Sequence, residues 1–310
     1  ARFAIATLAE GRVQAITDPV TLKTVEYATF RAAWDRFSAI HGDGLPRAAA
    51  IAVACPVNGG LVKMTNTPWV LRPDCLGAEL GLDDLILVND FGAVGRAVGQ
   101  VKKDALVHIS GPDVPLPNDG IISVIGPGTG LGVALVLRRN GRPHIVETEG
   151  GHSDFAPLDT VEDAILARLR PRFRRVSVER IVSGPGLLNM YQTLGAIEGK
   201  PTTIHDDKAL WAAALQARDP LAAAALERFM MTLGAVAGDI ALTQGANAVV
   251  IAGGIGARLA DTLPTSGFAD RFHAKGRFEP LMMTLPVKLM TDPKAGLIGA
   301  AAAFLEKHPT

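Results

Sequence analysis

The fold of this chain is decided by the stretch Ile121-Ile122-Ser123-Val124-Ile125-Gly126-Pro127-Gly128-Thr129-Gly130-Leu131-Gly132-Val133-Ala134-Leu135-Val136-Leu137. An apolar, β-branched run enters a loop with glycine at every second position, and a second apolar run leaves it. The second run leads to Asn140-Gly141, a dipeptide that favours a tight hairpin turn. The stretch therefore predicts a strand, a loop and a second strand.

The glycine loop could bind a phosphate group. Glycine lets backbone N–H groups approach an anion closely, successive N–H groups form a concave anion site, and the hydroxyl of Thr129 could also reach a phosphate. The two commonest phosphate loops do not match, because the spacing differs from G-x-G-x-x-G and no Lys-Ser/Thr pair follows as in G-x-x-x-x-G-K-[ST]. A plain turn within a hairpin is the alternative interpretation.

The composition indicates a soluble protein with a sizeable apolar core. The 310 residues carry 31 basic and 31 acidic side chains, and 48% of the chain is hydrophobic. A net charge of zero gives no sign of a nucleic-acid footprint, so we expect no nucleic-acid partner. Cys55 and Cys75 are too few for a disulfide framework or a cysteine-rich zinc site, which favours a reducing compartment. We expect both to be buried small apolar residues rather than reactive thiols. With neither a signal-peptide layout nor an uncharged apolar run of spanning length, we expect a cytoplasmic protein without a membrane partner.

Hydrophobic periodicity predicts alternating helices and strands along the chain. Apolar residues at helical spacing predict helices over 27–40, 159–170 and 220–244. Strands are predicted over Arg2–Leu8, Arg12–Ile16, Arg47–Val57, Ala248–Ala252 and Pro286–Met290. A Gly/Pro/Asp-rich stretch from Gly111 to Gly120 predicts a domain boundary.

Asn89 and Asp90 follow the short apolar run Leu85–Val88 and precede a predicted helix. In open α/β sheets, ligands bind outside the carboxyl ends of strands, so a carboxylate at this point is a candidate for chemistry. The alternative is ordinary helix capping, for which Asn and Asp are favoured residues.

A second polar group surrounds the Gly-Gly pair at 150–151, where Glu149, His152 and Asp154 lie close together in sequence. These three could ligate a metal, but a zinc site usually has more nitrogen or sulfur ligands. Carboxylates accept hydrogen bonds from hydroxyls and imidazole can accept or donate, so a site for a polyhydroxyl ligand is the more natural interpretation. We therefore assign no metal ligand.

Three further features are open to two interpretations each. Glu179, ahead of a Gly-Pro-Gly turn, could belong to the polar group or pair with a neighbouring arginine. Gly253 and Gly254 lie where a strand meets a helix, and they could expose bare backbone to a ligand or allow close packing. The basic run from Arg168 to Arg175 is typical of a solvated helix face.

Taken in order, these motifs resemble the bacterial glucokinase family from residue 1 to the C-terminal helix. The related sugar-kinase and repressor family with a cysteine-rich zinc motif is a poor fit, because only two widely spaced cysteines are present. The motifs that carry the resemblance are Asn89-Asp90-Phe91-Gly92-Ala93-Val94, Gly126-Pro127-Gly128-Thr129-Gly130-Leu131-Gly132, Glu149-Gly150-Gly151-His152-Ser153-Asp154-Phe155-Ala156-Pro157, Ser183-Gly184-Pro185-Gly186, Ala252-Gly253-Gly254-Ile255 and Gly296-Leu297-Ile298-Gly299-Ala300-Ala301.

The resemblance implies two ribonuclease-H-like α/β domains of the actin/hexokinase fold, with the active site in an interdomain cleft. The smaller domain is expected to take residues 1–110 and 291–310, and the larger one residues 111–290. It also implies a homodimer. The family begins with a strand and a loop of the form Asp-x-Gly-Gly-Thr just before the residues that match Ala1-Arg2-Phe3, so we expect the sequence to lack residues upstream of Ala1.

The resemblance further implies phosphorylation of glucose at O6 by Mg²⁺-ATP, with Asp90 as the general base. The positions expected to bind the other sugar hydroxyls are Asn89, Glu149, His152 and Glu179. The phosphates are expected at Gly128, Thr129 and Gly130, and the adenosine beside Gly253 and Gly254. Two alternatives remain, a kinase for another hexose on the same fold and a non-catalytic sugar sensor that keeps the pocket.

Overall fold

In the computed structural model, the glycine-rich stretch forms an antiparallel hairpin, as its sequence predicts. Strand β10 (Gly120–Pro127) enters the glycine loop and β11 (Leu131–Arg139) leaves it. Gly126 and Gly132 lie opposite each other on the two strands, and the loop itself comprises residues 128–130.

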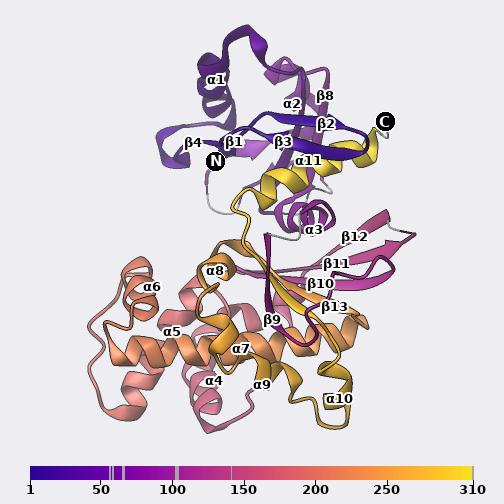
Figure 1. The fold of residues 1–310 in the computed structure, drawn as a ribbon. Coiled ribbons are helices and arrows are strands. Elements are labelled where there is room, and N and C mark those ends of the chain that lie inside the picture. The colour runs from indigo at the N-terminus through magenta and orange to yellow at the C-terminus, as the bar shows by residue number, and fades with distance from the viewer. Residues whose placement is uncertain (56, 58, 65–66, 102–104, 141, 309–310) are drawn as a thin grey trace. The chain divides into compact units, whose positions relative to one another are not determined.

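The chain divides into two compact units (Figure 1). Residues 1–55, 57, 59–64, 67–101, 105–140 and 142–308 are the ones that the structure describes. Unit 1 comprises Ala1–Lys102 and Asp292–Thr310, and unit 2 comprises Lys103–Thr291. The change of unit precedes the Gly/Pro/Asp-rich stretch at 111–120, because the strand before that stretch belongs to the sheet of unit 2.

Unit 2 is built on a six-stranded sheet with the order β12-β11-β10-β13-β14-β9. Strands β10, β13 and β14 run parallel to one another, and the other neighbours are antiparallel. The strands besides the hairpin are β9 (Leu106–Ser110), β12 (Arg142–Thr148), β13 (Ala248–Ile251) and β14 (Val287–Met290). The strands predicted over 248–252 and 286–290 are confirmed as neighbours inside this sheet.

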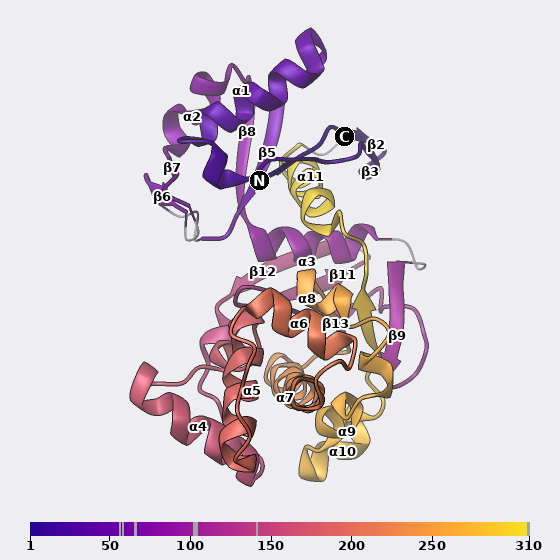
Figure 2. The same ribbon diagram turned by 90° about the vertical axis from the view of Figure 1, so that its left-hand side faces the viewer.

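Helix α7 (Pro220–Gln244) is the core helix of unit 2 and lies against β10 and β13, beside α5, α6 and α9 (Figures 1 and 2). Among the described residues it alone is long and apolar enough to cross a membrane, but 72% of its 18-residue apolar window is buried inside the fold. The remaining helices of unit 2 are α4 (Thr160–Phe173), α5 (Gly184–Glu198), α6 (Asp207–Leu215), α8 (Gly253–Arg258), α9 (Phe268–His273) and α10 (Glu279–Met282). The part of unit 2 that the structure describes also contains the 3-10 turns η4 (Gly150–His152), η5 (Val178–Arg180), η6 (Leu263–Thr265) and η7 (Gly276–Phe278).

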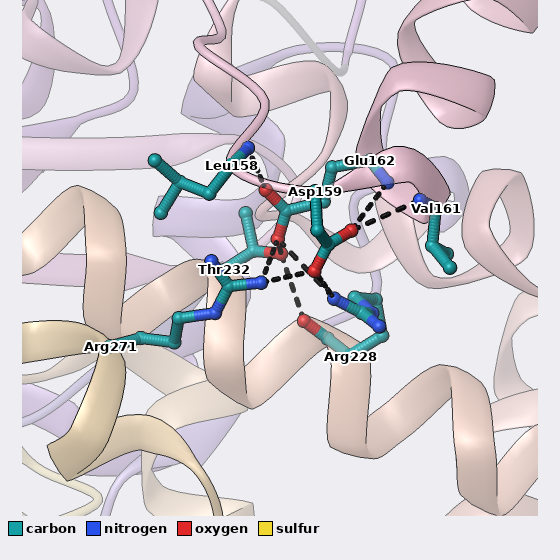
Figure 3. Close-up of polar contacts among 7 residues, drawn as sticks. All are labelled: Leu158, Asp159, Val161, Glu162, Arg228, Thr232 and Arg271. Atoms are coloured by element: carbon teal, nitrogen blue, oxygen red, sulfur yellow. Dashed lines mark hydrogen bonds and ion pairs between the residues drawn. The ribbon is translucent and has the colours of Figure 1, made fainter. Parts of the chain in front are cut away.

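A buried ionic cluster holds the start of α4 against α7 and α9 (Figure 3). Asp159 caps α4 with one carboxylate oxygen, and the other contacts Arg228 and Arg271. Glu162, whose side chain is only 1% exposed, lies 3.4 Å from Arg271 and accepts a hydrogen bond of 3.2 Å from Thr232. Burial alone would raise the pKa of Asp159, but the amide of Glu162 and the guanidinium of Arg228 outweigh it and hold that pKa below its ordinary value.

Unit 1 centres on the parallel strands β5 (Ala48–Val53) and β8 (Asp84–Asn89). Its other strands pair in twos: β1 (Arg2–Phe3) with β4 (Val20–Thr21), β2 (Ala6–Ala9) with β3 (Arg12–Ile16), and β6 (Val62–Lys63) with β7 (Val70–Leu71). Its helices and 3-10 turns are η1 (Thr24–Glu26), α1 (Phe30–His41), η2 (Gly42–Gly44), α2 (Pro73–Leu80), α3 (Asp90–Gln100) and α11 (Ala295–Lys307).

The prediction of one strand over Arg2–Leu8 is wrong, because the chain changes partner within it. Phe3 pairs with Val20, whereas Ala6 pairs with Ile16. Between them the N–H of Ile5 donates to the hydroxyl of Thr17 instead of to a strand, at 3.0 Å. A side-chain acceptor thus interrupts the ladder where the apolar pattern continues.

Helices α3 and α11 cross at Gly299, where there is no room for a side chain. A Cβ on Gly299 would collide with the backbone carbonyl of Ala93 in α3, which cannot rotate away. We therefore expect Gly299→Ala to lower the free energy of unfolding by about 1–3 kcal/mol, the usual cost of overpacking. Urea unfolding followed by circular dichroism measures the change.

Gly296 supplies the control in the same helix, since a Cβ there would meet open space. Gly296→Ala should be neutral or stabilising by up to ~1 kcal/mol, because alanine favours helix over glycine. Equal stability of the two variants would show that the α3–α11 crossing is not tight at Gly299.

Candidate active site

Asn89 and Asp90 have different roles at the junction of β8 and α3 in unit 1. The Oδ1 of Asn89 accepts hydrogen bonds from the N–H groups of Phe91 and Gly92, at 2.9 and 3.0 Å. The capping interpretation therefore holds for Asn89. Asp90 follows it as the first residue of α3 and is exposed.

Asp90 lies at the carboxyl edge of the parallel strands, where the topology predicts ligand binding. Val53 at the end of β5 pairs with Asn89 at the end of β8. Burial, together with the negative charge of Asp90, raises the pKa of the Cys55 thiol, two residues beyond β5. A hydrogen bond with Glu79 is the main cause that raises the pKa of Cys75. Raised pKa values disfavour both thiolates. Both side chains are only partly buried, however, so the prediction that they are buried is wrong.

In unit 2 the glycine loop is held from two sides. The N–H of Gly128 donates to the carbonyl of Gly130, and the N–H of Gly184 at the start of α5 donates to the carbonyl of Gly128, both at 2.8 Å. Gly253 begins α8 with a φ of +82°, and a Cβ there would lie 2.9 Å from the carbonyl oxygen of Pro127. The structure thus brings the loop and Gly253 together, with the exposed side chain of Thr129 at the tip.

Turn η4 packs on the first residues of β11, beside the loop. A Cβ on Gly151 would collide with the carbonyl of Leu131, so only glycine allows this approach. The neighbouring Glu149 and His152 lie on the surface, with Nε2 of His152 3.9 Å from the nearer carboxylate oxygen of Glu149 and side-chain exposures of 72% and 53%. Both predicted hydroxyl-binding side chains are therefore open to a ligand.

Asp154 binds an arginine, which argues against the metal-site alternative. Nη1 of Arg175 donates to Oδ1 of Asp154 at 2.8 Å and to the carbonyl of His152 at 2.6 Å. Within the described part of the chain, no group of three His, Cys, Asp or Glu residues could hold a metal ion. The basic run by itself predicts a solvated face, and the role of Arg175 is not visible in it, because a contact with a loop 21 residues earlier leaves no local pattern.

Arg175 should therefore matter for ligand binding at η4. In the Arg175→Ala variant the loop that carries His152 loses two hydrogen bonds. We expect the polyhydroxyl ligand predicted for Glu149 and His152 to bind roughly fivefold more weakly, a loss of about 1 kcal/mol. Equilibrium titration measures the affinity. Arg168→Ala removes an exposed arginine of the same run on α4 and is the control; equal affinity in the two variants would contradict the prediction.

Glu179, in η5, joins the η4 region to the hairpin. Its Oε2 accepts a hydrogen bond of 3.0 Å from the N–H of Leu131, so its partner is the hairpin backbone and the arginine-pair interpretation is not needed. The two turns are tied together by a bridge between Asp154 and Ser177 and by a hydrogen bond of 2.9 Å from the N–H of Val178 to the carbonyl of Ser153.

A pocket of about 190 Å³ opens between the hairpin tip, η5 and α5. Thr129 and Glu179 both line it, together with Arg180 and the aromatic ring of Phe173. The guanidinium of Arg180 lies 4.4 Å from the centre of that ring. One predicted phosphate-binding residue, Thr129, and one predicted hydroxyl-binding residue, Glu179, therefore line the same hollow.

Comparison with known proteins identifies the family that the chain resembles. Residues 1–307 match the family model described as glucokinase. The chain is 58% identical over 308 residues to the glucokinase of Zymomonas mobilis subsp. mobilis, a match that covers 99% of this chain and 95% of that protein.

Solved structures with a similar fold identify the fold of this chain. The crystal structure of glucokinase from an Antarctic psychrotroph is 29% identical, covers 98% of this chain and 95% of its own, and has a TM-score of 0.83. A ROK family glucokinase from Streptomyces griseus in complex with glucose and AMPPNP is 20% identical, covers 97% and 95%, and has a TM-score of 0.63. The prediction of an α/β chain of the actin/hexokinase fold is confirmed.

Proposed function

The chain belongs to the glucokinase family, and from that premise we propose that it transfers the γ-phosphate of ATP to the 6-hydroxyl of glucose, with Asp90 as the general base. The observation that carries the base assignment is the junction of β8 and α3. Asn89 caps the helix there, while Asp90 lies at the carboxyl edge of parallel strands with an exposed side chain. A carboxylate at this position can accept a proton from a bound hydroxyl.

In the proposed reaction, the sugar O6 attacks the γ-phosphorus as its proton passes to the carboxylate of Asp90. The bond between the γ-phosphorus and the bridging oxygen of ADP breaks, and glucose 6-phosphate and ADP leave. Phosphoryl transfer of this kind depends chiefly on positioning and on charge stabilisation. Asp90 therefore has to orient O6 as well as take its proton.

We propose that four side chains bind the other sugar hydroxyls: Asn89, Glu149, His152 and Glu179. A sugar that lacks one of these hydroxyls, or carries it in the wrong place, leaves a polar group unpaired. Such a mismatch costs more than a misplaced apolar contact, so the set can discriminate among hexoses.

The donor side of the proposal uses the hairpin and the start of α8. The N–H groups of Gly128 to Gly130 and the hydroxyl of Thr129 would bind the phosphates, and Gly253 and Gly254 would lie beside adenosine. Mg²⁺ usually keeps several waters and reaches proteins through one or two carboxylates plus substrate phosphates, so we assign it to the ATP complex, where it neutralises phosphate charge. By family resemblance we also propose a cytoplasmic homodimer.

A matrix of donors and acceptors tests this function. Initial rates with glucose, mannose, fructose and N-acetylglucosamine, each with ATP or polyphosphate, should give the highest kcat/KM for glucose with ATP. A higher kcat/KM for another hexose would support the alternative kinase. Glucose binding without phosphoryl transfer from either donor would support the sugar-sensor alternative.

A further inference from the structure

The carboxylate of Glu179 reaches the backbone of the glycine hairpin. Its Oε2 accepts a hydrogen bond from the N–H of Leu131, the first residue of β11. Leu131 is only 5% exposed, so its N–H needs a partner within the protein. Glu179 therefore fixes the point at which the chain leaves the loop at 128–130.

Gly130 makes room for this contact. A Cβ on Gly130 would collide with Oε2 of Glu179, whereas a Cβ on Gly128 would meet open space. Gly130 is not among the glycines with a positive φ. The backbone conformation at 130 is an ordinary one, so the effect of a side chain there would be to displace the carboxylate of Glu179.

We propose that Glu179 is a positioning residue for the phosphoryl donor in addition to a ligand for the sugar. This inference rests on the proposed function, because it uses the roles proposed for the hairpin and for Glu179. One carboxylate oxygen holds the hairpin, and the other is the one that a sugar hydroxyl would meet. Glu179 and Thr129 line the same pocket, so the residue that holds the loop lies next to the hydroxyl assigned to the phosphates.

A shared residue couples the two substrates. A hydroxyl that donates to Glu179 restrains its carboxylate, and the restrained carboxylate restrains the loop that binds the phosphates. Sugar should therefore raise the affinity for the nucleotide, and by thermodynamic linkage the nucleotide must raise the affinity for sugar by the same factor.

Calorimetric titration of the full-length protein with Mg²⁺ and AMPPNP, without sugar, tests the inference. Glu179→Ala and Gly130→Ala should each weaken nucleotide binding by roughly tenfold, because each removes the same hydrogen bond to a charged group. The double variant should be no weaker than the weaker single variant, as expected for two changes in one contact. Circular dichroism checks that each variant is folded.

Glu149→Ala is the matched control, since it removes another proposed sugar ligand whose carboxylate lies beside His152 and not at the hairpin. Its nucleotide affinity without sugar should match the wild type. If Glu179→Ala also matches the wild type, the positioning role is excluded.

Amide hydrogen exchange separates this inference from the proposed function. Glu179→Ala should speed exchange of the Leu131 N–H, and Glu149→Ala should not. Equal exchange rates in the two variants would show that Glu179 does not protect this N–H. If the wild-type protein binds no AMPPNP but exchange of the Leu131 N–H still responds to Glu179→Ala, the proposed function fails and the hydrogen bond between Glu179 and Leu131 stands.

Discussion

Replacement of Asp90 by asparagine is expected to lower kcat for glucose phosphorylation by about 10²–10⁴-fold, the usual contribution of a general base. Asparagine keeps the shape of the side chain and can still hydrogen-bond to the sugar, but it cannot take the proton from O6. The dissociation constant for glucose should therefore change far less than kcat. Steady-state rates and calorimetric titration with glucose measure the two quantities.

Asp74 provides the control for Asp90, because both are exposed acids in the first turn of a helix of unit 1. Asp74→Asn removes the same favourable interaction with a helix N-terminus, which is worth about 0.3–1 kcal/mol of stability. It should leave kcat at the wild-type value. A wild-type kcat in Asp90→Asn, or an equal loss in both variants, would contradict the base assignment.

The hairpin could be predicted from sequence because its signals are local. Alternating glycines between two β-branched runs leave few other structures, and the glycine loop at 128–130 lies where the pattern placed it. The junction at Asn89 and Asp90 was predictable for the same reason, since strand end and helix start are adjacent in sequence. The different roles of these two residues could not be predicted. They depend on which side chain reaches the N–H groups of Phe91 and Gly92.

Contacts between distant segments left no comparable signal. Arg175 looks like one more cation of a basic run, and only the folded chain places it against the turn at His152. Glu179 was selected by family resemblance, yet its bond to Leu131 joins residues 48 apart. Glu162 lies in the first turn of α4, a position that favours an acid by helix polarity alone, and sequence periodicity does not reveal its burial.

Removal of that carboxylate in Glu162→Ala is expected to cost about 3–5 kcal/mol, the range for breaking a buried ion pair. Oε1 of Glu162 lies 3.4 Å from Arg271 and accepts from Thr232, and Oε2 accepts from the N–H of Leu158 at 2.8 Å. All three groups would lose an acceptor, and the hydrogen bond from Thr232 is fully buried. For a unit of this size, the loss corresponds to a fall in Tm of roughly 6–20 °C.

Asp163 provides the control for Glu162, because it is the next residue in the first turn of α4 and its side chain is exposed. Comparing the two separates the effect of burial on stability from the effect of a negative charge at the helix N-terminus. Both carboxylates interact favourably with the helix N-terminus, but only Glu162 has buried partners. Asp163→Ala should therefore lose no more than about 1 kcal/mol. Scanning calorimetry of the two variants decides the matter: if their Tm values fall equally, the cluster in Figure 3 contributes only surface electrostatics, and the anchoring of α4 to α7 and α9 must come from apolar packing.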